Sequence, residues 1–259
     1  MSALGRPIAI LMYHQIDVAP PKGSPLRGLV VAPRTFFTHM AVMWLLGYRG
    51  LSMSELEPYL LGRRVGKVFG ITFDDGYLNN LRHALPVLKR FGFTSTCYVV
   101  SGLLGKTNVW DAGQGIAQVP LMDSADLQAW AAAGQEVGSH TQTHANLSLL
   151  SDTDLNLEVK GSKAALESIV WQSGGVRHFC YPYGALNADA VDAARVGGYA
   201  TATTTMRGRI RPDRPIDMLR LPRVLVSRTT TWLHLLLKCF TRYEDKRSAM
   251  PDVYDYTKT

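Results

Sequence analysis

The chain has 259 residues, of which 46% are hydrophobic and 19% are charged. This length and apolar content suffice for one domain with a large core, and they exclude a mainly disordered protein. The formal net charge is +7 at pH 7, but the basic residues are dispersed and no nucleic-acid-binding motif surrounds them, so we expect no nucleic-acid partner. We predict one domain over residues 6–243 and a C-terminal tail over 244–259.

The first half of the chain alternates between strand and helix patterns. The apolar run from Ile8 to Tyr13 predicts a strand that ends just before His14. A helix is expected after Pro33, because apolar residues then recur at helical spacing: Phe36, Met40, Met43, Trp44 and Leu46. Serines and glutamates over 52–57 resemble another helix start. The run 68–73 predicts a second buried strand, and 79–91 predicts the helix that follows it.

The second half continues the alternation. Strands are predicted over 94–100, 136–139, 177–181 and 199–204, and helices over about 124–133, 152–170 and 187–196. Strands separated by helices predict a parallel sheet that closes, or nearly closes, into a barrel of about seven strands. The carboxyl ends of such strands share one rim, so polar residues that follow the strands should meet there. The long glycine-rich loop over 101–120 is expected to be functional.

Two pairs of polar residues follow predicted strands. Asp74 and Asp75 are adjacent, and two such charges repel unless a cation or a proton lies between them. The alternative is that one carboxylate caps the next helix and the other is solvated. His140 and His144 are four residues apart, which on a helical turn lets both imidazoles reach one ion, although such a pair can also be two surface histidines. Two histidines and a carboxylate form an open site for zinc, iron, cobalt or nickel.

The sequence Thr72-Phe73-Asp74-Asp75-Gly76 together with Ser139-His140-Thr141-Gln142-Thr143-His144 resembles the first two motifs of the polysaccharide deacetylases of carbohydrate esterase family four, also called the NodB class. The resemblance extends from about Ile8 to Thr204. It implies a distorted (β/α) barrel in which Asp74 is the general base and Asp75, His140 and His144 bind one divalent metal ion, with zinc expected first. Phe179 to Gly184 resembles the third motif, which implies that the backbone N–H of Tyr183 helps to form the oxyanion hole.

Two departures from the family pattern concern the catalytic groups. Cys180 stands where the third motif usually has an arginine that orients the base, and Arg223 is one candidate to replace it. The usual C-terminal Leu-x-His is also missing, because His234 lies in an apolar helical stretch. At the other end of the chain, Met12-Tyr13-His14 resembles the N-terminal Tyr-His of the circularly permuted biofilm subgroup that deacetylates poly-β-1,6-N-acetylglucosamine. This resemblance implies that His14 is the general acid.

The predicted function is metal-dependent removal of N-acetyl groups from an amino-sugar polysaccharide, oligosaccharide or glycolipid. Two alternatives remain open: a non-catalytic carbohydrate-binding protein on the same fold, and a related amidase acting on a non-sugar C–N bond. Trp110, Tyr77 and Tyr183 are near the expected rim, where they would either stack on sugar rings or pack the loop onto the barrel.

The expected location is the cytoplasm. Three cysteines without C-x-x-C spacing suggest reduced thiols, and neither a signal peptide nor a segment of membrane-spanning length is seen. The apolar stretch Thr230 to Phe240 has Leu233, Leu236, Leu237 and Phe240 at helical spacing. Packing against the barrel is the favoured interpretation of this stretch, with peripheral membrane contact as the alternative. The sequence makes no prediction of oligomeric state.

Overall fold

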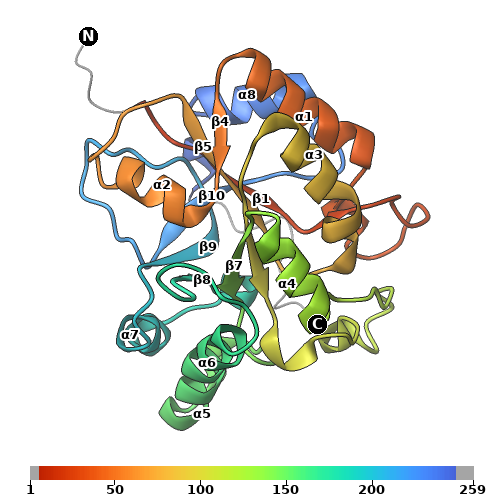
Figure 1. Cartoon of the computed structure of the whole chain (residues 1–259), viewed down its shortest axis with the longest axis vertical. Helices are drawn as coiled ribbons and strands as arrows, with labels where there is room; N and C mark the ends of the chain where they lie inside the picture. The colour runs from red at the N-terminus through yellow and green to blue at the C-terminus, as the bar shows by residue number, and fades with distance from the viewer. Residues whose placement is uncertain (1–5, 249–259) are drawn as a thin grey trace.

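The computed structural model describes residues 6–248, and its centre is a closed barrel of parallel strands (Figure 1). In chain order the barrel strands are β1 (Ile10–Tyr13), β5 (Val68–Phe73), β6 (Thr96–Val99), β7 (Glu136–Ser139), β8 (His178–Cys180), β9 (Thr201–Arg207) and β10 (Leu221–Leu225). Strand β1 closes the ring, because it pairs in parallel with both β10 and β5. The predicted fold class is therefore confirmed.

Three short strands lie outside this ring. Strand β4 (Arg49–Leu51) pairs with the first half of β5, and β1 pairs with its second half. Strands β2 (Gln15–Ile16) and β3 (Val30–Val31) pair with each other. None of the three was predicted, because segments of two or three residues are too short for a hydrophobic period to be recognised.

The barrel strands with uninterrupted apolar sequences are buried along their whole length. Every residue of β1 and of β5 is buried, as expected for parallel strands covered on both faces. The prediction for β5 matches its bounds, and the other predicted strands are correct to within a few residues at each end.

Helices surround the barrel (Figure 1). They are α1 (Pro33–Leu45), α2 (Met53–Leu60), α3 (Leu85–Phe91), α4 (Ser124–Ala132), α5 (Asp152–Asn156), α6 (Ser162–Glu167), α7 (Ala188–Val196) and α8 (Trp232–Phe240). Side-chain caps begin several of them: Ser52 caps α2, Asn187 caps α7, and Asp123 forms a capping box with Asp126 at α4. These polar caps explain why the starts of the helices could be read from the sequence.

Two predicted helices are not regular. The helix expected over 79–91 begins with π-helical turns at Asn80–Ala84 before α3, and the helix expected over 152–170 is divided by π-helical turns at Leu157–Gly161. Such insertions are frequent at functional sites, since the wider turn redirects a side chain.

The expected buried stripes of α1 and α8 are only partly buried. On α1, Phe36, Met40 and Met43 are buried, but Trp44 is 53% exposed and the following Leu46 is 42% exposed. On α8 the expected packed stripe was wrong for three of its four positions: Leu236 packs against the core, whereas Leu233, Leu237 and Phe240 are exposed and Leu235, Lys238 and Cys239 are buried instead. None of the helices among residues 6–248 is long and apolar enough to cross a membrane.

The segment just beyond α8 is anchored by buried charges. Glu244 is fully buried and accepts two hydrogen bonds from Arg207, at 2.7 and 2.8 Å, and Lys238 Nζ lies 3.2 Å from it. The predicted domain boundary at residue 243 stays a prediction, and residues 249–259 of the predicted tail lie outside the described residues.

A buried histidine on α1 should make folding sensitive to acid. His39 is fully buried between the Tyr13 hydroxyl and the Thr230 carbonyl, and burial lowers its pKa from 6.5 to about 4. Between these pH values the unfolded chain binds a proton that the folded chain does not, so the free energy of unfolding falls as the pH falls. The loss should approach about 3 kcal/mol at pH 4. The free energy of unfolding of His39→Gln, measured with urea, should lack this fall between pH 6.5 and 4. An equal dependence on pH in the two proteins would show that His39 is not its cause.

Candidate active site

The residues singled out in the sequence meet at the carboxyl ends of the barrel strands. His14 follows β1, Asp74 and Asp75 follow β5, His140 follows β7, and Tyr183 lies in the tight turn Pro182–Gly184 after β8. These five side chains and that of His144 line one cavity of about 180 Å³. The sequence placed them on one rim, and the structure brings them together there.

Asp75, His140 and His144 form a set of three potential metal ligands. Asp75 Oδ1 lies 3.4 Å from His140 Nε2 and 3.3 Å from His144 Nε2. Ligand atoms bound at 2.0–2.1 Å in a tetrahedral zinc site lie roughly 3.3 Å from one another. Direct charge-assisted hydrogen bonds would be shorter, at about 2.7–2.9 Å. The spacing of these three side chains therefore fits a divalent ion better than a carboxylate hydrogen-bonded to two imidazoles.

The orientation of the two imidazoles supports this fit. His140 Nδ1 lies 2.7 Å from the carbonyl oxygen of Cys180 and must donate to it, because a carbonyl only accepts. The neutral ring then has its lone pair on Nε2, which points at Asp75. His144 Nδ1 is buried without a hydrogen-bond partner among the described residues. Its ring is held by aromatic contacts instead, because Trp110 stacks on it at 4.4 Å and Tyr183 meets it edge-on at 4.5 Å.

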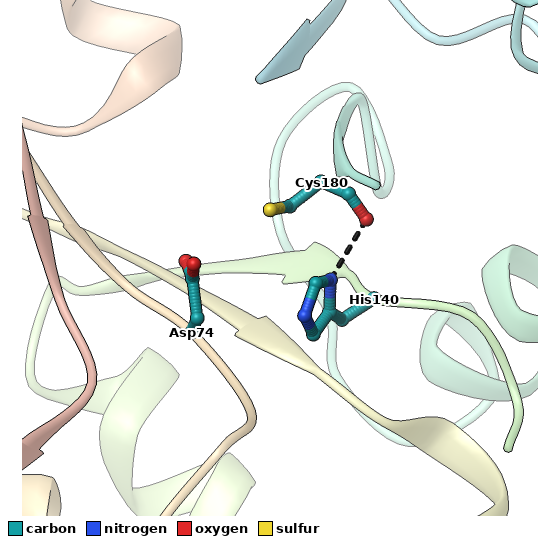
Figure 2. A group of neighbouring side chains, drawn as sticks. All are labelled: Asp74, His140 and Cys180. Atoms are coloured by element: carbon teal, nitrogen blue, oxygen red, sulfur yellow. Dashed lines mark hydrogen bonds between the residues drawn. The ribbon is translucent and has the colours of Figure 1, made fainter. Parts of the chain in front are cut away.

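Asp74, His140 and Cys180 form a second set whose potential ligand atoms lie close together (Figure 2). Figure 2 shows the Cys180 thiol directed towards Asp74, while the Cys180 carbonyl holds His140. This second set does not suit a cation, because both oxygens of Asp74 are already bound by the positively charged Arg223. The structure therefore distinguishes the two adjacent carboxylates, since Asp75 belongs to the ligand set and Asp74 does not.

Arg223, the candidate named for the missing motif arginine, binds Asp74. From β10 its guanidinium donates to Asp74 Oδ1 at 2.6 Å and to Asp74 Oδ2 at 2.7 Å, and it also donates to the Thr204 carbonyl and to the Cys180 sulfur. The Arg223 side chain is fully buried. Cys180, a smaller residue than arginine, thus contacts an arginine that comes from another strand.

The two aspartates both remain ionised despite their burial. Burial raises the pKa of Asp74, but the charge and the hydrogen bonds of Arg223 outweigh it and leave that pKa below its ordinary value. Burial also raises the pKa of Asp75, but the two imidazoles beside it lower that pKa by more than burial raises it. Each carboxylate is therefore stabilised in its ionised form by its own neighbouring groups.

His14 lies beside Asp74 in the cavity. His14 Nε2 is 3.9 Å from Asp74 Oδ2, and its Nδ1 is buried without a hydrogen-bond partner among the described residues. Asn80, in the π-helical turns before α3, fixes the backbone here: it donates to the His14 carbonyl at 2.7 Å and accepts from the Ile16 amide at 3.2 Å.

The loop between the two histidines is held in a similar way from the other π-helical segment. Glu158 accepts hydrogen bonds from the backbone amides of Gln142 and Thr143 at 2.8 and 3.0 Å, and from the Thr143 hydroxyl at 2.6 Å. Asn80 and Glu158 were not identified from the sequence. Both act on the backbone of a rim loop and belong to no recognisable local pattern.

Backbone strain is concentrated at this rim. Five non-glycine residues in the described part of the chain have positive φ, and four of them are Asp75 (73°), Thr141 (67°), His144 (64°) and Tyr183 (59°). Left-handed conformations are unfavourable for residues with a Cβ and persist where the surrounding structure imposes them, often at functional sites. Three of these four residues, Asp75, His144 and Tyr183, are also among those selected from the sequence by residue chemistry and the family resemblance.

The rest of the cavity wall is mainly apolar. Met12, Leu29 and Leu225 form a small buried cluster on one side, and Ile116 and Val119 of the long loop lie on another. Of the three aromatic residues considered for sugar stacking, Trp110 and Tyr183 both pack on His144, and Tyr77 is buried. Packing within the protein is thus the interpretation that the structure favours for Trp110 and Tyr77.

A closed parallel barrel with carboxylates and histidines gathered at its mouth is the architecture of an α/β-barrel enzyme. The family model described as "Polysaccharide deacetylase" matches residues 62–202. The chain is 30% identical over 222 residues to the Bacillus subtilis protein YxkH, which is assigned to the polysaccharide deacetylases, and the match covers 85% of this chain and 71% of YxkH. The chain therefore belongs to the polysaccharide deacetylase family, and it is a deacetylase hydrolase.

Two further relatives agree with this assignment. The poly-β-1,6-N-acetyl-D-glucosamine N-deacetylase of Staphylococcus epidermidis is 24% identical over 192 residues, which cover 72% of this chain and 65% of the relative. The structure of the Streptococcus pyogenes deacetylase PplD in complex with acetate is similar with a TM-score of 0.78 and 26% identity, covering 90% of this chain and 98% of PplD. The family resemblance seen in the sequence is confirmed.

Proposed function

We propose that this deacetylase depends on one divalent metal ion, held by Asp75, His140 and His144, and removes acetyl groups from the nitrogen of an amino sugar. The observation that carries the proposal is the 3.3–3.4 Å spacing of the three ligand atoms beside a carboxylate, Asp74, that is bound separately by Arg223. Zinc is the first expectation for this donor set, and iron, cobalt or nickel would also suit it.

A divalent ion bound by these residues would polarise the acyl carbonyl and make a bound water more acidic. Asp74 lies next to this position and is ionised, so it can accept the proton of the attacking water. The backbone N–H of Tyr183 would donate to the acyl oxygen as negative charge develops there. The left-handed turn at Tyr183 fixes the direction of that N–H before the substrate arrives.

His14 is the proposed general acid. Its Nε2 lies near Asp74, and Asn80 hydrogen-bonds to the backbone carbonyl of His14. A protonated His14 would donate to the nitrogen of the departing amine, which leaves as the amino sugar while the acyl group leaves as acetate. His234, in the apolar C-terminal helix, does not line the cavity, and its ring packs edge-on against Tyr243.

The size of the cavity supports a substrate of which only one part enters the cavity. Pockets that enclose a whole small ligand have volumes of roughly 300–1,000 Å³. The cavity at the barrel mouth measures about 180 Å³, which suits one acylated sugar unit with the remainder of an oligosaccharide, polysaccharide or glycolipid outside.

Arg223 should control the ionisation of the base. In Arg223→Lys the charge remains but the two parallel hydrogen bonds cannot form, and the pKa of Asp74 should rise. We expect kcat/KM to fall by about 10- to 100-fold, and the acidic limb of its pH profile to move to higher pH. Arg220→Lys, at an exposed position, is the control. If the acidic limb did not shift, Arg223 would not control the pKa of the catalytic base.

The proposed function is tested by acetate release from an N-acetylated amino-sugar oligomer, with and without a chelator. Release that stops on chelation and returns with added zinc is expected. The assay should include an N-formyl sugar and a cyclic amide, because the same residues would also serve a related amidase. If only the cyclic amide were hydrolysed, the proposed sugar substrate would be wrong. Undiminished turnover after metal removal would refute the metal dependence.

A further inference from the structure

Helices α1 and α8 expose an unusual number of large apolar side chains. Seventeen large hydrophobic residues are exposed among residues 6–248, and eight of them lie on these two helices or at the residue that follows α1. We define the α1–α8 face by these eight residues: Phe37, Trp44, Leu45, Leu46, Trp232, Leu233, Leu237 and Phe240. Concentrations of this kind on a folded surface usually mark an interaction site.

The face is continuous across neighbouring elements. Helix α1 contacts α8 on one side and α3 on the other, and Figure 1 shows α1 beside both. Ring contacts join the parts, since Tyr48 lies 4.9 Å from Phe240, and Phe91 of α3 lies 6.0 Å from Trp44 and 5.4 Å from Phe37. None of the eight residues of the face lines the catalytic cavity. The α1–α8 face is therefore separate from the catalytic cavity.

Its charge is of one sign. The segments 18–54, 76–110 and 218–243, which contain α1, α3 and α8, have no aspartate or glutamate. Basic groups lie among the aromatic rings, because the Arg90 guanidinium is 5.6 Å from the ring centre of Phe37 and Lys67 Nζ is 5.9 Å from that of Tyr48. The exposed basic residues of these and adjoining segments include Arg34, Arg49, Lys67, Lys89, Arg90 and Arg242.

We infer that the α1–α8 face docks onto an anionic lipid surface. Leucines and tryptophans can enter the boundary between headgroups and acyl chains, and surrounding lysines and arginines attract anionic headgroups. A second copy of the chain suits the face less well, because it would bring two basic surfaces together. This inference goes beyond the deacetylase activity and does not depend on it, so lipid binding is measured without substrate.

The test is sedimentation of the full chain with phosphatidylcholine vesicles that contain or lack phosphatidylglycerol. Binding is expected only with the anionic lipid, and weakening with salt. The double variant Leu233→Ser/Leu237→Ser should lose most of the binding and keep the circular dichroism spectrum, since both positions are exposed. The control Leu149→Ser/Trp171→Ser alters residues that are 80% and 89% exposed on other elements, and it should bind like the parent.

A charge variant separates lipid binding from other uses of the face. Lys89→Glu/Arg90→Glu should weaken binding by about fivefold or more for each basic residue removed. Equal binding to neutral and anionic vesicles, or no effect of either variant, would overturn the inference. A stable dimer in light scattering that Leu233→Ser/Leu237→Ser dissociates, with no vesicle binding by the parent, would assign the face to self-association instead.

Discussion

Asp74→Asn is expected to reduce kcat by about 10²- to 10⁴-fold while the protein keeps its full content of metal. Asparagine cannot accept the proton of the attacking water, whereas Asp75, His140 and His144 are unchanged. The measurements are acetate release and metal analysis of the same purified sample. His14→Gln should show the same combination, because His14 is also proposed to move a proton and not to bind the ion.

The matched control is Asp111→Asn. Asp111 is another buried carboxylate that lines the cavity, and its side chain is held by Asn108 at 2.9 Å and not by Arg223. We expect a much smaller loss of turnover from this change. If Asp74→Asn lost its metal, or if it turned over as fast as Asp111→Asn, the role of Asp74 as a base would be wrong.

The second large effect is expected at the ligand set itself. His140→Ala removes one of three donors and leaves Asp75 with a single imidazole, so metal affinity should fall by at least about 100-fold and activity should disappear with it. Metal content after dialysis and activity at increasing zinc concentration measure both. Partial recovery at high zinc is expected, because Asp75 and His144 remain 3.3 Å apart.

His178→Gln is the control for removing a buried histidine. His178 is as buried as His140, but it is bonded to Ser54 and Thr201 and does not line the cavity. Its replacement should lower stability without releasing metal. Retention of metal and activity by His140→Ala would mean that Asp75 and His144 do not share an ion with His140.

Much of the fold could be predicted because its strands carry a strong local signal. Strands β1 and β5 are uninterrupted apolar runs, and the polar residues just after them mark the rim. Strand β10 was missed because Pro222 and Arg223 interrupt its apolar pattern. The charge of Arg223 serves its ion pair with Asp74. The same charge interrupts the apolar run by which the strand could have been recognised.

The parts of the site that the sequence left open or missed act across long distances in the sequence: Arg223 was only one candidate to bind the base, and Asn80 was not identified. Arg223 binds a carboxylate 149 residues away, and Asn80 holds a backbone 66 residues away. The pairing of such groups depends on how the barrel closes and on the π-helical turns that redirect Asn80 and Glu158. By contrast, the three proposed metal ligands could be selected from the sequence because they come from two short segments with distinctive residues.

Closure of the barrel by its first strand has a consequence for dissecting this protein. The segment 62–202, which the family model matches, contains β5 to β8 and the start of β9 but neither β1 nor β10. Expressed by itself, that fragment would have unpaired strand edges on both sides and would be prone to aggregate. It would also lack both His14 and Arg223. A fragment that keeps the barrel closed and contains both residues must therefore extend from before Ile10 to beyond Leu225.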